Sequence, residues 1–380
     1  MTDSPPQRAG SPNPMLQRAF SLPISQRAWR EVQKGPPSIA LELQEKIPVT
    51  HNLAPGELLV KVEAAALNPI NYKLMEMLPN TMARRPHTAG NDFTGTVVSS
   101  QGVTGFENGD PVCGWVSQSM AQITSQGSLC EYVRVRSDHV VRRPSNLSPI
   151  QAAGLCLAGL SAYKLLYVDA KIKGSGQRVL INNASGGVGT FAVQMAKASG
   201  CHVTASVSPA TRELVLGLGA DDVFDYHAEP IADALTREPP ERPFDAIIDC
   251  YGLDSNLYAK SEHYLKPDGV FASVAPAKGS IFGTASAAAG LFTHAWRPKW
   301  MGGTQRKLSM LNLENSKEEL RALAAMVESG KVVPVVDSVF KFDDVQMAFE
   351  RLQSGHAHGK VVVVVNADLY LEQKQTKLVQ

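Results

Sequence analysis

The chain of 380 residues has few cysteines, almost no net charge and no long apolar run. Its five cysteines are isolated, so none has the spacing of a redox or zinc motif, and a disulfide framework is not indicated. We therefore expect a reducing compartment, the cytoplasm. The net charge of +1 gives no sign of binding to nucleic acid or to an acidic membrane surface. No apolar run reaches the length of a membrane span, so no membrane association is expected.

The N-terminal segment is rich in Pro, Ser, Gln and Arg and has little apolar periodicity. This composition predicts a disordered segment over residues 1–28. Arg8, Arg18, Arg27 and Arg30, with only Asp3 as a nearby acid, weakly resemble a mitochondrial presequence. Four prolines before residue 15 oppose an amphipathic helix there, so the mitochondrion is kept only as the alternative location.

The most informative feature that is present lies between Gln177 and Lys197. An apolar strand over residues 178–181 is followed by Ala184-x-Gly186-x-x-Gly189 and then by apolar residues at helical spacing. Glycines in such a turn let the backbone approach a pyrophosphate, and the first N–H groups of the helix face its charge. The segment predicts a dinucleotide site. Asn183, before the motif, either reaches the cofactor or closes the turn.

The cofactor preference follows from what stands at the end of the second strand of this unit, near residue 206. An NAD site normally has an acidic residue there, but residues 206–212 read Ser-Val-Ser-Pro-Ala-Thr-Arg. Hydroxyls and a guanidinium favour the 2′-phosphate of NADPH, although Ser208 and Thr211 can equally cap the next helix. The predicted cofactor-binding residues are Ser185, Gly186, Gly187, Val188, Gly189, Ser206, Ser208, Arg212 and Tyr226.

The order of elements predicts two structural units. Strands and helices alternate through the middle of the chain, which indicates a doubly wound parallel sheet over residues 161–310. Short strands separated by Pro and Gly turns indicate a β-rich unit over residues 29–160. A helix near residues 343–354 and the apolar strand 361–365 return to that unit over residues 311–370, followed by a tail at 371–380.

Several motifs in this order resemble the medium-chain dehydrogenase/reductase superfamily, in its zinc-independent quinone oxidoreductase and enoyl reductase branch. The resemblance covers about residues 29–366. It implies a GroES-like catalytic domain, a Rossmann cofactor domain and hydride transfer from NADPH to a quinone or an activated carbon–carbon double bond. It rests on residues 67–73 (LNPINYK), 89–97 (AGNDFTGTV), 108–114 (NGDPVCG), 152–163 (AAGLCLAGLSAY), the glycine turn and 354–362 (SGHAHGKVV).

The resemblance also implies that no metal is bound. Where the alcohol dehydrogenase branch has cysteine and histidine ligands for zinc, this chain has Asn68, Asn91-Asp92 and Leu157, and Cys156 stands one residue from the expected place. Asn is a poor zinc ligand. The four-cysteine lobe of the structural zinc is missing as well, and the pair His356 and His358 reads as a surface loop.

Two catalytic residues are predicted from the resemblance. Asn68 is expected to orient the nicotinamide carboxamide or the substrate. Tyr72 is expected to donate a proton, with a packed aromatic as the alternative. Asn71 stands where the family usually has Asp, which leaves the partner of Lys73 in doubt.

Three functions are compatible with these residues: a reductase of quinones or α,β-unsaturated carbonyl compounds, a trans-acting enoyl reductase of a polyketide synthase, and a non-catalytic NADPH-binding protein. A zinc alcohol dehydrogenase is disfavoured. A loop and helix over Gly279–Phe292 should cover the cleft, and a homodimer would be joined by the edge strand near Gly269–Pro276. An apolar small-molecule substrate is expected from Phe282, Phe292, Trp296 and Trp300.

Overall fold

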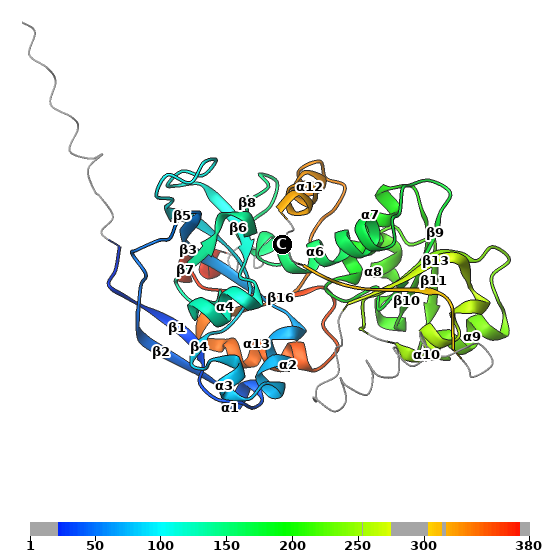
Figure 1. Cartoon of the computed structure of the whole chain (residues 1–380), viewed down its shortest axis with the longest axis horizontal. Helices are drawn as coiled ribbons and strands as arrows, with labels where there is room; N and C mark the ends of the chain where they lie inside the picture. The colour runs from blue at the N-terminus through cyan, green and yellow to red at the C-terminus, as the bar shows by residue number, and fades with distance from the viewer. Residues whose placement is uncertain (1–21, 253, 275–302, 314–316, 373–380) are drawn as a thin grey trace, which may run out of the picture.

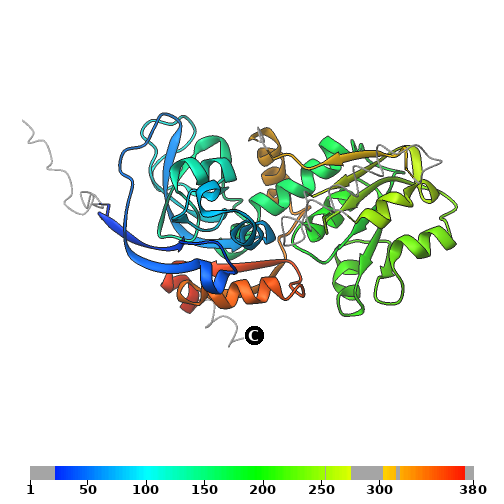
Figure 2. The same cartoon turned by 60° about the horizontal axis from the view of Figure 1, so that its bottom comes forward.

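The computed structural model describes residues 22–252, 254–274, 303–313 and 317–372. The chain forms two lobes side by side, joined through helix α6 (Cys156–Tyr163) (Figure 1). Turning the molecule shows that the N-terminal part of the chain and its last part, from about residue 317, share one lobe, while the middle of the chain forms the other (Figure 2). In the described part of the chain, no helix has the length and apolar character needed to cross a membrane.

The middle of the chain forms a six-stranded sheet in which every pairing is parallel. The strand order is β11-β10-β9-β12-β13-β14, which is the doubly wound order predicted above. Its strands are β9 (Arg178–Asn182), β10 (His202–Val207), β11 (Asp222–Asp225), β12 (Phe244–Asp249), β13 (Leu265–Ser273) and β14 (Lys307–Met310). The connecting helices include α7 (Gly189–Ala198), α8 (Arg212–Gly217), α9 (Ile231–Arg237) and α10 (Ser255–Ala259).

Burial on both faces explains why these strands are continuously apolar. Val179, Leu180 and Ile181 of β9 have no exposed surface, because helices cover both sides of a parallel sheet. Phe191 and Met195 of α7 are equally buried against the sheet. The central strand and the helix that follows it are therefore rigidly packed on either side of the glycine turn.

The β-rich lobe contains a seven-stranded sheet of order β15-β16-β3-β5-β6-β8, with β7 paired to β3. Strand β16 lies between β15 and β3, so a strand from the C-terminal part completes the sheet begun near residue 57. The β-rich unit predicted from the short strands is therefore present, and the C-terminal part returns to it as expected. The strands are β3 (Glu57–Leu67), β5 (Asp92–Ser99), β6 (Pro111–Trp115), β7 (Tyr132–Arg136), β8 (Val140–Arg142), β15 (Val336–Lys341) and β16 (Lys360–Val364).

A separate three-stranded sheet shows that ordered structure begins earlier than residue 29. It has the order β2-β1-β4, with β1 at Ser25–Glu31, β2 at Leu41–Pro48 and β4 at His87–Thr88. The prediction of disorder up to residue 28 is therefore wrong from Ser25 onward, because Ala28 and Trp29 are buried in the core. Residues 1–21 and 373–380 lie outside the described residues.

The helices of the β-rich lobe surround its sheets and carry the segments that face the other lobe. Helix α6 approaches α12 closely, since a Cβ built on Gly159 would lie 2.9 Å from a methyl group of Leu323. The helices are α1 (Pro37–Ala40), α2 (Pro69–Met77), α3 (Asn80–Ala83), α4 (Gln118–Thr124), α5 (Pro149–Ala153), α12 (Lys317–Glu328) and α13 (Val345–Gln353). A π-helix (Lys164–Asp169) continues α6 toward the parallel sheet.

The predicted edge strand is also corrected. Strand β13 contains Gly269 but pairs with β12 on one side and β14 on the other, so β14 forms the edge of the sheet. The predicted cover at Gly279–Phe292, and the aromatic residues Phe282, Phe292, Trp296 and Trp300, lie outside the described residues.

Candidate active site

The glycine turn between β9 and α7 has the shape of a phosphate cradle. Asn183 adopts a left-handed backbone with φ of 59°, which turns the chain away from β9. A Cβ at Gly189 would lie 2.2 Å from the carbonyl oxygen of Asn183, so only glycine lets the helix begin this close to the strand. The N–H of Thr190 already donates to the Gly186 carbonyl at 3.0 Å, whereas the N–H groups of residues 187–189 make no backbone hydrogen bond in the described structure and are suited to bind an anion.

Ser206 holds the glycine turn in place through two hydrogen bonds. Its hydroxyl accepts a hydrogen bond from the Asn183 N–H at 2.9 Å and donates one to Oδ1 of Asn182 at 2.7 Å, and its side chain is buried. The hydroxyl of Ser206 is thus bonded within the protein, and its contact with a cofactor stays a prediction. The Asn183 amide donates to the Cys250 carbonyl at 3.5 Å, so it closes the turn, as one of the two interpretations expected.

The residues predicted for the adenosine end meet beyond the carboxyl ends of β10 and β11. Ser208 lies 3.1 Å from the hydroxyl of Thr211 and accepts from the Thr211 N–H through its carbonyl, so it caps the next turn. Arg212 is exposed at the start of α8. Tyr226 is 45% exposed, and its N–H donates to the carbonyl of Val207. An arginine and an aromatic ring therefore lie beyond the carboxyl ends of β10 and β11.

Side chains at the ends of neighbouring strands form a polar layer that was not predicted. The amide of Asn182 donates to Asp249 at 3.1 Å, and the hydroxyl of Ser273 donates to the other oxygen of Asp249 at 2.7 Å. Asp249 also accepts the N–H groups of Tyr251 and Gly252, which fixes the loop after β12. The available signal was a polar residue ending each apolar strand.

A buried lysine stands where the two lobes meet. The ammonium of Lys360, at the start of β16, donates to the Leu67 carbonyl at 3.1 Å, to Oδ1 of Asn68 at 2.5 Å and to Asp92 at 3.3 Å. Asp92 also accepts from the Asn68 amide at 2.9 Å and, through its other oxygen, from the Leu157 N–H at 2.8 Å. In the sequence, Lys360 stands out only as part of the motif at residues 354–362, so its place in the site was not predicted.

The attraction between Lys360 and Asp92 offsets part of the free-energy cost of burying their charges. Burial raises the pKa of Asp92 and lowers the pKa of Lys360, while their mutual attraction acts in the opposite direction on both groups. The side chain of Lys360 is 3% exposed and that of Asp92 is 0% exposed, so water screens the pair little. An ion pair this deeply buried persists only when its hydrogen bonds are satisfied, as they are here.

The same residues do not suit zinc. Two of the positions that resemble zinc ligands, Asn68 and Asp92, contact the ammonium of Lys360, and this positive charge would repel a divalent cation. The thiol of Cys156 is buried and hydrogen-bonded to Cys113. Across the described ranges, no cluster of three His, Cys, Asp or Glu side chains is placed to hold a metal. His356 is exposed and His358 half-buried in the segment between α13 and β16.

The hydrogen bonds of Asn71 explain why this chain has Asn where the family usually has Asp. Asn91 donates from its amide to the Val116 carbonyl at 2.6 Å, which turns its oxygen toward Asn71. That oxygen needs a donor, and the amide of Asn71 supplies one at 2.5 Å, whereas a carboxylate could not. Asn71 in turn accepts the Asn68 N–H at 2.9 Å. This chain of amides fixes the loop that carries Asn68.

Tyr72 follows on the same helix and is half-buried. Burial, together with Glu76 and Tyr251, raises the pKa of its phenol, so the hydroxyl keeps its proton at neutral pH. Tyr251 belongs to the loop after β12, in the lobe of the parallel sheet. Lys73 lies 5.9 Å from the ring of Tyr72, and burial lowers its pKa to about 8, with Glu76 nearby.

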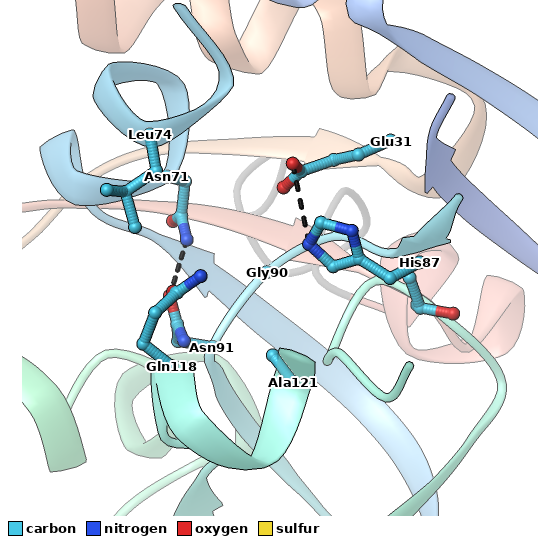
Figure 3. Close-up of a pocket in the computed structure, with 9 residues that line it drawn as sticks. Glu31, Asn71, Leu74, His87, Gly90, Asn91, Gln118 and Ala121 are labelled. Atoms are coloured by element: carbon cyan, nitrogen blue, oxygen red, sulfur yellow. Dashed lines mark hydrogen bonds and ion pairs between the residues drawn. The ribbon is translucent and has the colours of Figure 1, made fainter. Parts of the chain in front are cut away.

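A small polar pocket lies directly behind the amide chain (Figure 3). Glu31 and His87 lie together on one side of it, 3.5 Å apart, while Asn71 and Asn91 form the opposite wall. The guanidinium of Arg85 lies 3.5 Å from Glu31 and donates to carbonyl groups near the C-terminal end of α2. Arg85, held by Glu31 of the pocket, therefore fixes the end of α2 opposite to the end that carries Asn68.

Comparisons with known proteins agree with this arrangement. Family models described as "Alcohol dehydrogenase GroES-like domain" and "Zinc-binding dehydrogenase" match residues 54–145 and 218–363. The trans-enoyl reductase pgmF of Aspergillus terreus is 32% identical over 92% of this chain and 98% of its own length. The zinc-type alcohol dehydrogenase-like protein C16A3.02c of Schizosaccharomyces pombe is 34% identical over 88% and 95%. The quinone oxidoreductase structure from Coxiella burnetii superimposes with a TM-score of 0.73 at 28% identity, covering 90% and 99%.

Glu31 should make stability depend on pH. Burial raises its pKa to about 7 despite Arg85, so the folded state favours the protonated form, and stability falls as pH rises from about 4.5 to 7. The substitution Glu31→Gln removes this dependence. Its unfolding free energy relative to the wild type should increase by up to about 3 kcal/mol between about pH 4 and pH 8, measured by denaturant titration.

The protonation of His87 affects stability in the opposite pH direction and does not alter this comparison. Burial, with Arg85 and Arg30, lowers the pKa of His87 to about 4, so its contribution is lost as pH falls from about 6.5 to 4 in both proteins and cancels in the difference. Glu213→Gln, which alters an exposed carboxylate on α8, serves as the control and should show no pH-dependent difference. A constant offset for Glu31→Gln would contradict the prediction.

Proposed function

The chain belongs to the medium-chain dehydrogenase/reductase superfamily, in its quinone oxidoreductase and enoyl reductase branch, and from this we propose an NADPH-dependent reductase of activated double bonds that works without a metal. That it is an oxidoreductase using a nicotinamide cofactor follows from the family. The choice of NADPH, the class of substrate and the roles of single residues are the proposal. The substrate is a small molecule of apolar character: a quinone, an enone or an enoyl thioester.

One observation carries the proposal: Lys360, Asp92 and Asn68 form a closed, charged network where relatives in the alcohol dehydrogenase branch hold zinc. Oxidation of an alcohol needs a group that binds and acidifies the hydroxyl, and zinc supplies this in the metal-dependent branch. Reduction of an alkene conjugated to a carbonyl does not, because the carbonyl itself accepts the developing charge. The network therefore favours reduction.

The residues of the turn fit the cofactor. Gly186, Gly187 and the first turn of α7 would hold the pyrophosphate, and Arg212 with Tyr226 would surround the adenosine 2′-phosphate. The acid that would disfavour this phosphate is missing at the end of β10, and Asp225 on the next strand turns its carboxylate toward the N–H of His227. When bound, NADPH supplies the hydride.

The protein's own groups orient the reaction and provide the proton. The amide nitrogen of Asn68 carries two hydrogens, of which Asp92 accepts one, so the other is available to a carbonyl or carboxamide. Hydride adds to the β-carbon and the enolate oxygen accepts a hydrogen bond. Tyr72 then gives its phenolic proton to the α-carbon, and solvent restores that proton because the ring is only half-buried.

Two alternatives remain in the same fold. The similarity to a trans-enoyl reductase favours an enoyl reductase that serves a polyketide synthase in trans, which would accept carrier-bound substrate far better than a free thioester. A non-catalytic NADPH-binding protein was suggested by Asn71, but the donor role of Asn71 toward Asn91 removes that argument. The five cysteines are free and buried, which favours a reducing compartment such as the cytoplasm.

Activity on a substrate panel tests the proposed function. Purified protein should consume NADPH, followed by its absorbance, with at least one of a set of enones, quinones and enoyl thioesters, and added chelator should not reduce the rate. Gly187→Val, which places a side chain against Lys360 in the turn, should be inactive and serves as the control. No NADPH consumption with any of the three substrate classes would overturn the proposal. A strong preference for a carrier-bound thioester would select the polyketide alternative.

Removal of the phenol tests the proton donor. Tyr72→Phe should lower kcat with an enone by about 100-fold or more, while NADPH binding changes little, because only the proton transfer is lost. Tyr132→Phe, a half-buried tyrosine on β7, should leave kcat unchanged. An unchanged kcat for Tyr72→Phe would show that Tyr72 is the packed aromatic of the second interpretation.

Arg212 should decide the cofactor preference. Arg212→Ala should raise the Kd of NADPH by about tenfold and leave the Kd of NADH unchanged, because a charge-assisted hydrogen bond to the phosphate contributes about 1.5–3 kcal/mol. Cofactor fluorescence measures both constants. Arg242→Ala, another exposed arginine of the same lobe, is the control. Equal weakening of both cofactors would place Arg212 outside the phosphate site.

A further inference from the structure

The side chain of Lys360 passes between two glycines. A Cβ built on Gly154 would lie 2.7 Å from its Cγ, and one built on Gly187 would lie 3.2 Å from its Cδ. Gly154 precedes α6, and Gly187 belongs to the turn predicted to hold the cofactor. Both glycines leave room for the lysine stem, so this path through the interior depends on the absence of two side chains.

The main chain beside Lys360 is bonded to the same turn. The N–H of Gly359 donates to the carbonyl of Ser185 at 3.0 Å, and Gly186 and Gly359 form an isolated parallel β-bridge. The backbone before Lys360 is thus attached to the cofactor turn, whereas its ammonium is attached to the catalytic loop at Leu67 and Asn68. A displacement of the turn would be transmitted along one side chain to that loop.

The charges also fix the orientation of the Asn68 amide. Its oxygen faces the ammonium of Lys360 and its nitrogen faces the carboxylate of Asp92. A rotation by half a turn would place a donor against the ammonium and an acceptor against the carboxylate. In a site with little screening by water, both contacts would be strongly unfavourable.

We propose that Lys360 is a positioning residue that couples occupation of the cofactor turn to the orientation of Asn68. Its ammonium holds the amide with one N–H directed to the ligand, and its attachment to residues 185–187 makes this arrangement respond to the cofactor. The inference rests on the proposed function for the identity of that ligand. Removal of the ammonium would therefore uncouple cofactor binding from the ordering of residues 67–72.

The test compares Lys360→Met with the double variant Lys360→Met/Asp92→Asn. The single variant leaves a carboxylate buried without its partner and should be strongly destabilised, whereas the double variant removes both charges and should fold. Lys266→Met is the matched control, because it removes a lysine paired with Asp245 on the rim of the parallel sheet. Fluorescence measures the Kd of NADPH, and hydrogen–deuterium exchange measures protection of residues 67–78 with and without NADPH.

In the wild type and in Lys266→Met, NADPH should slow exchange in residues 67–78. The double variant should still bind NADPH but lose this protection, and its kcat should fall by about 100-fold with a much smaller change in KM for NADPH, since a misplaced orienting group costs rate. Protection in the double variant equal to that of the wild type, or no protection in the wild type at saturating NADPH, would overturn the inference.

The exchange measurement needs no substrate, which separates the two proposals. If wild-type protein binds NADPH and shows the protection but reduces no substrate, the proposed reductase activity fails and the coupling through Lys360 stands. If it reduces substrate and the double variant keeps both protection and kcat, the coupling fails and the reductase stands. Failure of the wild type to bind NADPH would overturn both.

Discussion

The ammonium of Lys360 is enclosed by three oxygen acceptors at the junction of the two lobes, and the loop that carries Asn68 takes its shape from that contact. A single buried ammonium is costly, and Asp92 offsets the cost by lying 3.3 Å away. Asp92 in turn receives the N–H of Leu157 at the start of α6, the helix between the lobes. The pair thus joins β16, the loop before α2 and α6 at one point.

Helix α2 links the pair of Lys360 and Asp92 to the rest of the β-rich lobe. Its first turn is fixed by Asn71, which bonds to Asn68 and Asn91, and its last turn by Arg85, which donates to carbonyls including that of Leu78. Tyr72 lies between these two anchors. The helix of nine residues has little stability of its own, so its position depends on polar contacts at both ends.

The sequence allowed the parallel sheet and the glycine turn to be predicted because both depend on local pattern: an apolar strand, glycines at fixed spacing and a helical repeat. Strand β1 escaped prediction, since the composition of the residues before it suggested disorder, whereas pairing with β2 decides its structure. The contact of Lys360 with Asp92 spans 268 residues and has no local pattern. Asn71 was read as a departure from the family, and only the orientation of Asn91 explains it.

The left-handed turn at Asn183 has a further consequence for ligand binding. Ser206 and the carbonyl of Cys250 hold its backbone and side chain through hydrogen bonds made entirely within the protein. A loop that is ordered before its ligand arrives loses no conformational entropy when the ligand binds. For the proposed cofactor, the binding energy of the pyrophosphate would then be retained as affinity, and association would proceed as docking onto a preorganised surface.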